Sequence, residues 1–286
     1  MRKNIIPEFI SINNMNLSVT SWSFPNCSLQ EAVGISKVLN IPAIDLGYLH
    51  QPALDRKKII QQPRASAKKI RNYDITVPCF YHLFGDNTVD SNLSLEDHDG
   101  ENLRQLEAVS EFCSEASIDT LFVLPGVINP GQSAREAMAR SAENLRHMVD
   151  ICEKKGVSLA VEPHVGSCLE SPALVHELLD RVPGLTLVLD YAHFVCLGYT
   201  QDAIDELIPY ASHMHLRQTK PGNLQTDLET GTINFQAMLG ALAEESYEGY
   251  LSIEYVHQHY KNTLHEDVLT ETIKMRNLVR AWNQKR

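Results

Sequence analysis

Four residues that could bind a metal ion follow or close four short apolar segments in the second half of the chain. They are Glu162 after residues 158–161, Asp190 after 185–189, His215 at the end of 211–215, and Glu254 after 249–253. Short, nearly unbroken apolar runs are typical of strands buried on both faces of a parallel sheet. In α/β folds the carboxyl ends of such strands bear catalytic and ligand-binding groups. We therefore expect these side chains to meet at one edge of a sheet and to bind a divalent cation.

The donor atoms of this set indicate which ion it would bind. Three carboxylates and one imidazole form an oxygen-rich set, which favours Mn²⁺, Mg²⁺ or Co²⁺, with Zn²⁺ as an alternative. Taken singly, each acid would be an ordinary strand-end residue paired to a neighbouring base. Because all four occupy the same position in successive segments, a shared metal site is the better interpretation.

Segments with strand character alternate with segments of helical spacing along the chain. The expected strands cover residues 16–24, 42–46, 75–83, 120–124, 158–162, 185–190, 211–215 and 249–254. Helix starts are marked by Ser28 with Glu31, a capping-box pattern, and by Ser171 followed by proline. The polar residues 85–99 are expected to form a long loop. No linker interrupts the alternation, so residues 1–286 are predicted to form a single α/β domain, a (β/α)8 TIM barrel.

Composition narrows the classes of function. The chain has 286 residues, 43% of them hydrophobic, and a net charge of −11, which argues against nucleic acid or an anionic membrane as a partner. The same charge is also ordinary for a soluble protein. No apolar run approaches the roughly 20 residues of a membrane span, and the first residues lack a signal-peptide core. The six cysteines have no paired spacing, which predicts a reduced, cytoplasmic protein.

The order of motifs resembles one known superfamily. The motifs are Glu162, Asp190-x-x-His193, His213-x-His215-x-Arg217, Gly-Thr-Ile-Asn-Phe at 231–235, and Ile253-Glu254. This order, over residues 100–256, resembles the xylose-isomerase-like TIM barrels. That superfamily includes sugar and sugar-acid isomerases and epimerases, inosose dehydratases and type IV apurinic endonucleases. The resemblance implies the same barrel fold, and Glu162, Asp190, His215 and Glu254 as metal ligands.

The resemblance also implies a substrate site beside the metal. In sugar epimerases of this kind the residues matching His193 and Arg217 bind substrate oxygens, and a guanidinium fork suits a carboxylate, phosphate or ketose oxygen. The alternatives are a loop-stabilising role for His193 and a surface ion pair for Arg217. His164, His82 and Trp22 are expected to line the pocket, although His164 could equally stabilise its loop and the other two could serve packing alone.

One group within the superfamily is excluded by a missing histidine pattern. Apurinic endonucleases bind three metal ions and have a histidine at the end of the fourth strand. In this chain the fourth strand ends in Leu124-Pro-Gly, and the residue two after Asp227 is Glu229. A trinuclear zinc site is therefore not expected.

Three functions remain open. The first is a metal-dependent isomerase or epimerase of a small sugar or sugar acid, which forms an enediolate with Glu162 and Glu254 as the acid and base. The second is a metal-dependent decarboxylase or lyase of a 3-oxo sugar acid, with Arg217 on the carboxylate. The third is a barrel that only binds a ligand, against which the complete metal set argues. A homodimer is a further expectation, because barrels of this superfamily often pair.

Overall fold

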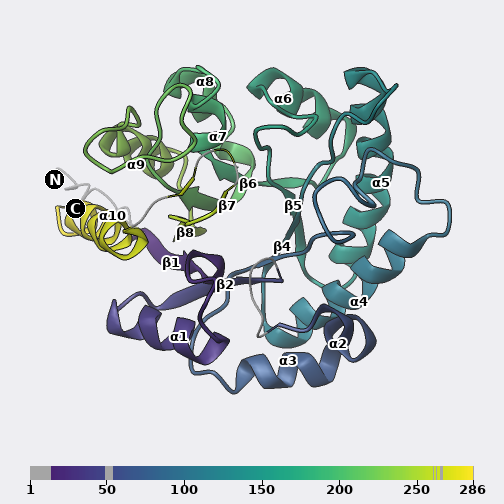
Figure 1. Cartoon of the computed structure of the whole chain (residues 1–286), viewed down its shortest axis with the longest axis horizontal. Helices are drawn as coiled ribbons and strands as arrows, with labels where there is room; N and C mark the ends of the chain where they lie inside the picture. The colour runs from purple at the N-terminus through teal and green to yellow at the C-terminus, as the bar shows by residue number, and fades with distance from the viewer. Residues whose placement is uncertain (1–13, 49–53, 260, 262, 265–266, 286) are drawn as a thin grey trace, which may run out of the picture.

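The computed structural model describes residues 14–48, 54–259, 261, 263–264 and 267–285. Eight parallel strands form a closed barrel in which each strand pairs with the next and β1 pairs with β8. The strands are β1 (Asn16–Thr20), β2 (Ala43–Gly47), β3 (Cys79–Tyr81), β4 (Thr120–Val123), β5 (Ser158–Val161), β6 (Thr186–Asp190), β7 (Ala211–Leu216) and β8 (Tyr250–Ile253). The predicted TIM-barrel fold is confirmed (Figure 1).

Helices connect the strands and surround the barrel (Figure 1). The α-helices are α1 (Leu29–Val38), α2 (Arg56–Gln61), α3 (Pro63–Arg71), α4 (Glu101–Ala116), α5 (Ala134–Glu153), α6 (Pro172–Arg181), α7 (Tyr191–Val195), α8 (Gln201–Asp205), α9 (Phe235–Glu244) and α10 (Val268–Asn283), with 3-10 helices η1 (Ser21–Ser23) and η2 (Ile208–Tyr210). The capping box at Ser28 and the helix start at Ser171 are confirmed. In the part of the chain that the structure describes, no helix is long and apolar enough to cross a membrane.

Alternation along each strand divides the apolar residues between two cores. In β4, Leu121 and Val123 pack against the surrounding helices, whereas Phe122 points into the barrel with Tyr81 and Val188. Successive side chains of a strand point to opposite faces, so every second residue of each strand reaches the barrel interior. Because of this periodicity, inward-facing residues at the ends of different strands point into the same interior of the barrel.

Several element boundaries differ from the sequence expectation. The first strand stops at Thr20, and η1 follows and turns Trp22 inward. The third strand is short and follows Pro78, which has no N–H for the ladder. The short helix α7 was not expected; it begins because the Asp190 carboxylate accepts a hydrogen bond from the Ala192 backbone N–H at 2.8 Å. The closing helix was expected from His265, which lies outside the described residues.

The last helix closes the barrel beside its first strand. Asn283 on α10 accepts a hydrogen bond from the Met15 N–H and donates one to the Met15 carbonyl, both at 3.1 Å. Figure 1 shows α10 next to β1. This contact joins the chain regions that begin and end the barrel.

Candidate metal and substrate site

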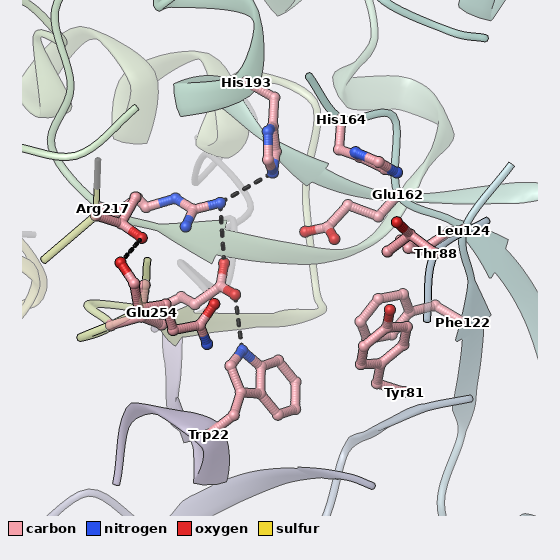
Figure 2. A pocket seen from close by; sticks show the side chains of 13 residues that line it. Trp22, Tyr81, Thr88, Phe122, Leu124, Glu162, His164, His193, Arg217 and Glu254 are labelled. Atoms are coloured by element: carbon pink, nitrogen blue, oxygen red, sulfur yellow. Dashed lines mark hydrogen bonds and ion pairs between the residues drawn. The ribbon is translucent and has the colours of Figure 1, made fainter. Parts of the chain in front are cut away.

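A cavity of about 190 Å³ opens at the carboxyl ends of the strands. One wall is polar and consists of Glu162, His164, His193, Arg217 and Glu254. The other wall is mostly apolar and consists of Trp22, Tyr81, Thr88, Phe122, Leu124 and Val256, with Gln258 and Thr263 nearby. Figure 2 shows the charged groups facing this apolar wall. The arrangement suits a small ligand with several oxygen atoms on one side.

His215 is buried next to two carboxylates of the polar wall and does not itself line the cavity. Its Nδ1 is 2.7 Å from Glu162 Oε1 and 3.2 Å from Glu254 Oε2. The second oxygen of Glu254, Oε1, accepts a hydrogen bond of 2.7 Å from the Trp22 indole (Figure 2). Glu162, His215 and Glu254 each offer one potential metal-binding atom, and these three atoms lie within 4.8 Å of one another. Three of the four predicted metal ligands therefore converge.

Asp190, the fourth predicted ligand, is held by Arg217. Arg217 Nη2 is 2.6 Å from Asp190 Oδ2, 3.4 Å from Glu254 Oε2 and 2.9 Å from His193 Nε2. Potential metal-binding atoms of Asp190, Glu162 and His193 also lie within 4.8 Å of one another. Glu162 thus belongs to two overlapping sets of potential ligands, and the guanidinium neutralises part of the negative charge between them.

Burial and neighbouring charges separate the pKa values of the acids. Burial raises the pKa of Glu162 and of Asp190, although His215 and Arg217, respectively, act in the opposite direction. Burial would also raise the pKa of Glu254, but Arg217 and His215 lower it to about 2. Burial would lower the pKa of His215, yet the Glu254 and Glu162 carboxylates raise it well above its usual value. A proton shared among the acids would therefore reside on Glu162 before Glu254.

The donor set fits a divalent cation. Two carboxylates and one imidazole face the same point, and the buried Glu254 Oε2 forms no hydrogen bond within the described residues despite its two ionic neighbours. Asp190 Oδ1 accepts from Ala192 and Oδ2 from Arg217, yet each carboxylate oxygen has a second lone pair for an ion. Oxygen-rich sets of this kind suit Mn²⁺, Mg²⁺ or Co²⁺, and Zn²⁺ is bound by the same ligand types. The choice of ion remains a prediction.

Of the residues Trp22, His164 and His82, which were predicted to line the pocket, the structure places the first two in the cavity wall. Trp22 and His164 both line the cavity, and burial lowers the pKa of His164 to about 4, so its imidazole is neutral. The structure does not place His82 in the cavity wall. Its ring lies between Tyr48 and Phe84, with centroids 5.6 and 4.5 Å away. The expectation for His82 is corrected, because strand alternation turns it away from the barrel interior.

The neighbour of His82, Tyr81, occupies the cavity wall instead. Tyr81 stacks on Phe122 with ring centroids 4.7 Å apart and an interplanar angle of 10°. Both rings face the polar wall across the cavity (Figure 2). The motifs in the sequence did not indicate either residue as part of the pocket. For Tyr81 the available signal was the alternation within residues 79–82, which puts it on the same face as Cys79, and the structure shows that this face points inward.

A second buried polar group lies one layer deeper in the barrel. Asp45 on β2 is completely buried, and its Oδ2 is 2.6 Å from His213 Nε2 and 3.7 Å from His215 Nε2. Burial alone would raise the pKa of Asp45, but the His213 imidazole holds it well below its usual range. Asp45 is therefore an ionised carboxylate beneath the predicted metal ligands.

Comparison with known proteins identifies the family. Residues 36–276 match the family described as xylose isomerase-like TIM barrel. The chain belongs to the xylose isomerase-like TIM barrel family. The resemblance inferred from the motifs is thereby confirmed, together with the fold.

Relatives of this xylose isomerase-like barrel include enzymes of several kinds. Inosose dehydratase 1 of Bacillus cereus is 24% identical over 159 residues, which cover 48% of this chain and 53% of the relative. The match thus spans about half the length of this curated relative.

Solved structures with the same fold are more distant in sequence. The IOLI protein with a binding zinc atom has a TM-score of 0.72 and 18% identity, covering 94% of this chain and 99% of its own. L-ribulose 3-epimerase has a TM-score of 0.72 and 17% identity, covering 95% and 96%. At these identities the likeness establishes the fold.

Proposed function

We propose that this chain is a divalent-metal-dependent isomerase or epimerase of a small sugar or sugar acid. The observation that supports it best is the convergence of Glu162, His215 and Glu254 within 4.8 Å, with the two carboxylates lining the cavity. His193 and Arg217 lie on the same polar wall, where they can contact substrate oxygens. The names of its relatives, among them an epimerase, agree with this class of reaction.

Glu162 and Glu254 are the proposed proton-transfer pair. When bound, a divalent ion would supply a Lewis acid that polarises a substrate carbonyl. Glu162, whose pKa is raised by burial, is suited to take a proton from the adjacent carbon. Glu254 is ionised, so it first takes a proton from the substrate hydroxyl that becomes the new carbonyl, or from solvent, and then returns that proton to the neighbouring carbon or to the opposite face. The Trp22 N–H holds the Glu254 carboxylate at 2.7 Å. Arg217 and His193 orient the substrate oxygens, and the apolar wall restricts water.

Hydrogen exchange with solvent tests this proposal. We would incubate Mn²⁺-loaded protein with a panel of ketoses and aldonates in D₂O and follow the products by NMR. We expect deuterium at the carbon beside the carbonyl, and a rate lower by about 10²–10⁴-fold in Glu162→Gln, because general-base catalysis is lost. Glu244→Gln, an exposed change on α9, is the matched control. Unchanged exchange in Glu162→Gln would contradict the assigned base.

A decarboxylase or lyase of a 3-oxo sugar acid is the second candidate. Arg217 is the only lysine or arginine among the described residues that line the cavity, and its planar fork suits a carboxylate. A dehydratase among the relatives keeps lyase chemistry open. CO₂ release from a 3-oxo aldonate, with deuterium only in the shortened product, would favour this candidate over isomerisation. Absence of any Mn²⁺-dependent turnover on both panels would favour a barrel that only binds a ligand.

A further inference from the structure

Asp45 has an unusual set of neighbours for a residue with no assigned role. It lies on β2 with no exposed surface, and its Oδ2 is hydrogen-bonded to His213 Nε2 at 2.6 Å. The same oxygen is 3.7 Å from His215 Nε2, and the other oxygen, Oδ1, forms no hydrogen bond within the described part of the chain. The Asp45 carboxylate therefore faces two imidazoles, and its Oδ1 is available to accept a further hydrogen bond.

The ring of His215 is oriented so that its two nitrogens face different carboxylates. Nδ1 points to Glu162 and Glu254, whereas the buried Nε2 points to Asp45 and forms no hydrogen bond in the described structure. Trp22 and Phe122 contact the ring at centroid distances of 5.9 and 5.5 Å. These contacts restrict rotation, so the choice of nitrogen that faces the acids is built into the barrel.

Metal binding through Nδ1 determines where the proton of His215 must be. A neutral imidazole that gives its Nδ1 lone pair to an ion carries its proton on Nε2. That N–H is buried, so it needs an acceptor within the protein. Asp45 is the carboxylate it faces, and histidine ligands generally donate their second N–H to such a group.

We propose that Asp45 is a positioning residue that accepts hydrogen bonds from both His213 and His215, and so fixes His215 in the tautomer that binds metal through Nδ1. This inference rests on the metal site of the proposed function. A carboxylate has enough lone pairs for both donors, and a small rotation of Asp45 would offer Oδ1 to one of them and Oδ2 to the other. His213 takes one of these acceptor oxygens, and the tautomer of His215 depends on the other.

Metal affinity tests the inference without any need for a substrate. We would measure the Kd for Mn²⁺ from the electron paramagnetic resonance signal of the free ion. Asp45→Asn keeps the shape of the side chain but replaces one acceptor oxygen with a donor. We expect its Kd to rise by about 10–100-fold, the usual effect of losing the partner of a metal-binding histidine. His213→Gln retains an N–H donor toward Asp45 and is the matched control, with a Kd near that of the wild type.

The outcomes separate this inference from the proposed function. If the wild type binds no Mn²⁺, or Glu162→Gln binds it equally well, the metal site itself is wrong and Asp45 has no such role. If the wild type binds Mn²⁺ through Glu162 but Asp45→Asn binds it as tightly, only the positioning role is overturned. Equal weakening in Asp45→Asn and His213→Gln would also overturn it, because the effect would then come from the buried pair as a whole.

A second measurement applies if Asp45→Asn does not fold. Histidines of the wild-type, Zn²⁺-loaded protein would be labelled with ¹⁵N and their tautomers read by NMR. A protonated Nε2 on His215, with a downfield and slowly exchanging proton, supports the hydrogen bond to Asp45. A proton that exchanges rapidly with water, or an unprotonated Nε2, overturns it.

Discussion

At the scale of single residues, Arg217 neutralises part of the negative charge of the site before a ligand enters. Its guanidinium is buried and pairs with Asp190 at 2.6 Å and Glu254 at 3.4 Å. The alternative of a surface ion pair, considered from the sequence, does not apply. Any substrate oxygen that binds Arg217 must share it with two carboxylates, so the contact would contribute more to orientation than to overall affinity.

His82 leads to a prediction about acid stability. Burial lowers the pKa of His82 to about 3, and neither ring nitrogen forms a hydrogen bond within the described residues. Above pH 6.5 the histidine is neutral in both folded and unfolded chains. Between pH 6.5 and about 3 the unfolded chain binds a proton that the folded chain excludes, so stability falls as the pH falls. Each pH unit in this window costs up to about 1.4 kcal/mol.

His82→Phe should remove the loss of stability that protonation of His82 in the unfolded chain causes at acidic pH. We expect the free energy of unfolding in urea to decline less between about pH 6.5 and 4.5 than in the wild type, and to be no lower at about pH 7. His98→Gln, which replaces an exposed histidine, serves as the control. Parallel curves for wild type and His82→Phe would show that His82 is not buried as a neutral group.

At the scale of elements, helix starts depend on local side chains that the sequence displays. Ser171 caps α6 by accepting a hydrogen bond from the Leu174 N–H at 3.2 Å, and Pro172 occupies the first turn. The helix then leads into β6, which ends at Asp190. Loss of the cap would leave a backbone N–H without its partner at the start of this unit.

Ser171→Ala should therefore lower the free energy of unfolding by about 1 kcal/mol, the usual cost of an N-cap. Ser171→Asp keeps an acceptor at the same position and should stay near the wild type. Urea unfolding at neutral pH provides the comparison. Equal stability of the alanine and aspartate variants would mean that Pro172 and packing alone start the helix.

At the scale of the whole molecule, the predicted metal site links the strands on one side of the barrel. Its residues lie at the ends of β5, β6, β7 and β8, so an ion bound there would connect segments that are far apart in the chain. An ion that binds only the folded state stabilises it by mass action, by about 2.7 kcal/mol at roughly 100 times its Kd.

Mn²⁺ should accordingly raise the melting temperature, measured at one fixed scan rate, and a chelator should reverse the rise. Glu162→Gln should show a smaller shift at the same Mn²⁺ concentration, because one ligand of the site is weakened. An identical shift in the variant would indicate binding elsewhere on this acidic protein.

The sequence by itself determined the features that depend on near neighbours. Apolar runs that end in Glu162, Asp190 or Glu254 predicted buried strands with acids at one edge, and Ser171 with Pro172 predicted a helix start. These signals are readable because periodicity and capping act within a few residues. The barrel and the convergence of Glu162 with Glu254 followed from that regular alternation.

Only the tertiary structure decided which residues meet across the barrel. Asp45 and His213 are 168 residues apart, and they touch because closure and strand stagger bring β2 and β7 to the same layer. The same geometry turned Tyr81 into the cavity and His82 out of it. A shift of one residue in a strand reverses the facing of every side chain, so such contacts depend on register and closure, which local periodicity does not encode.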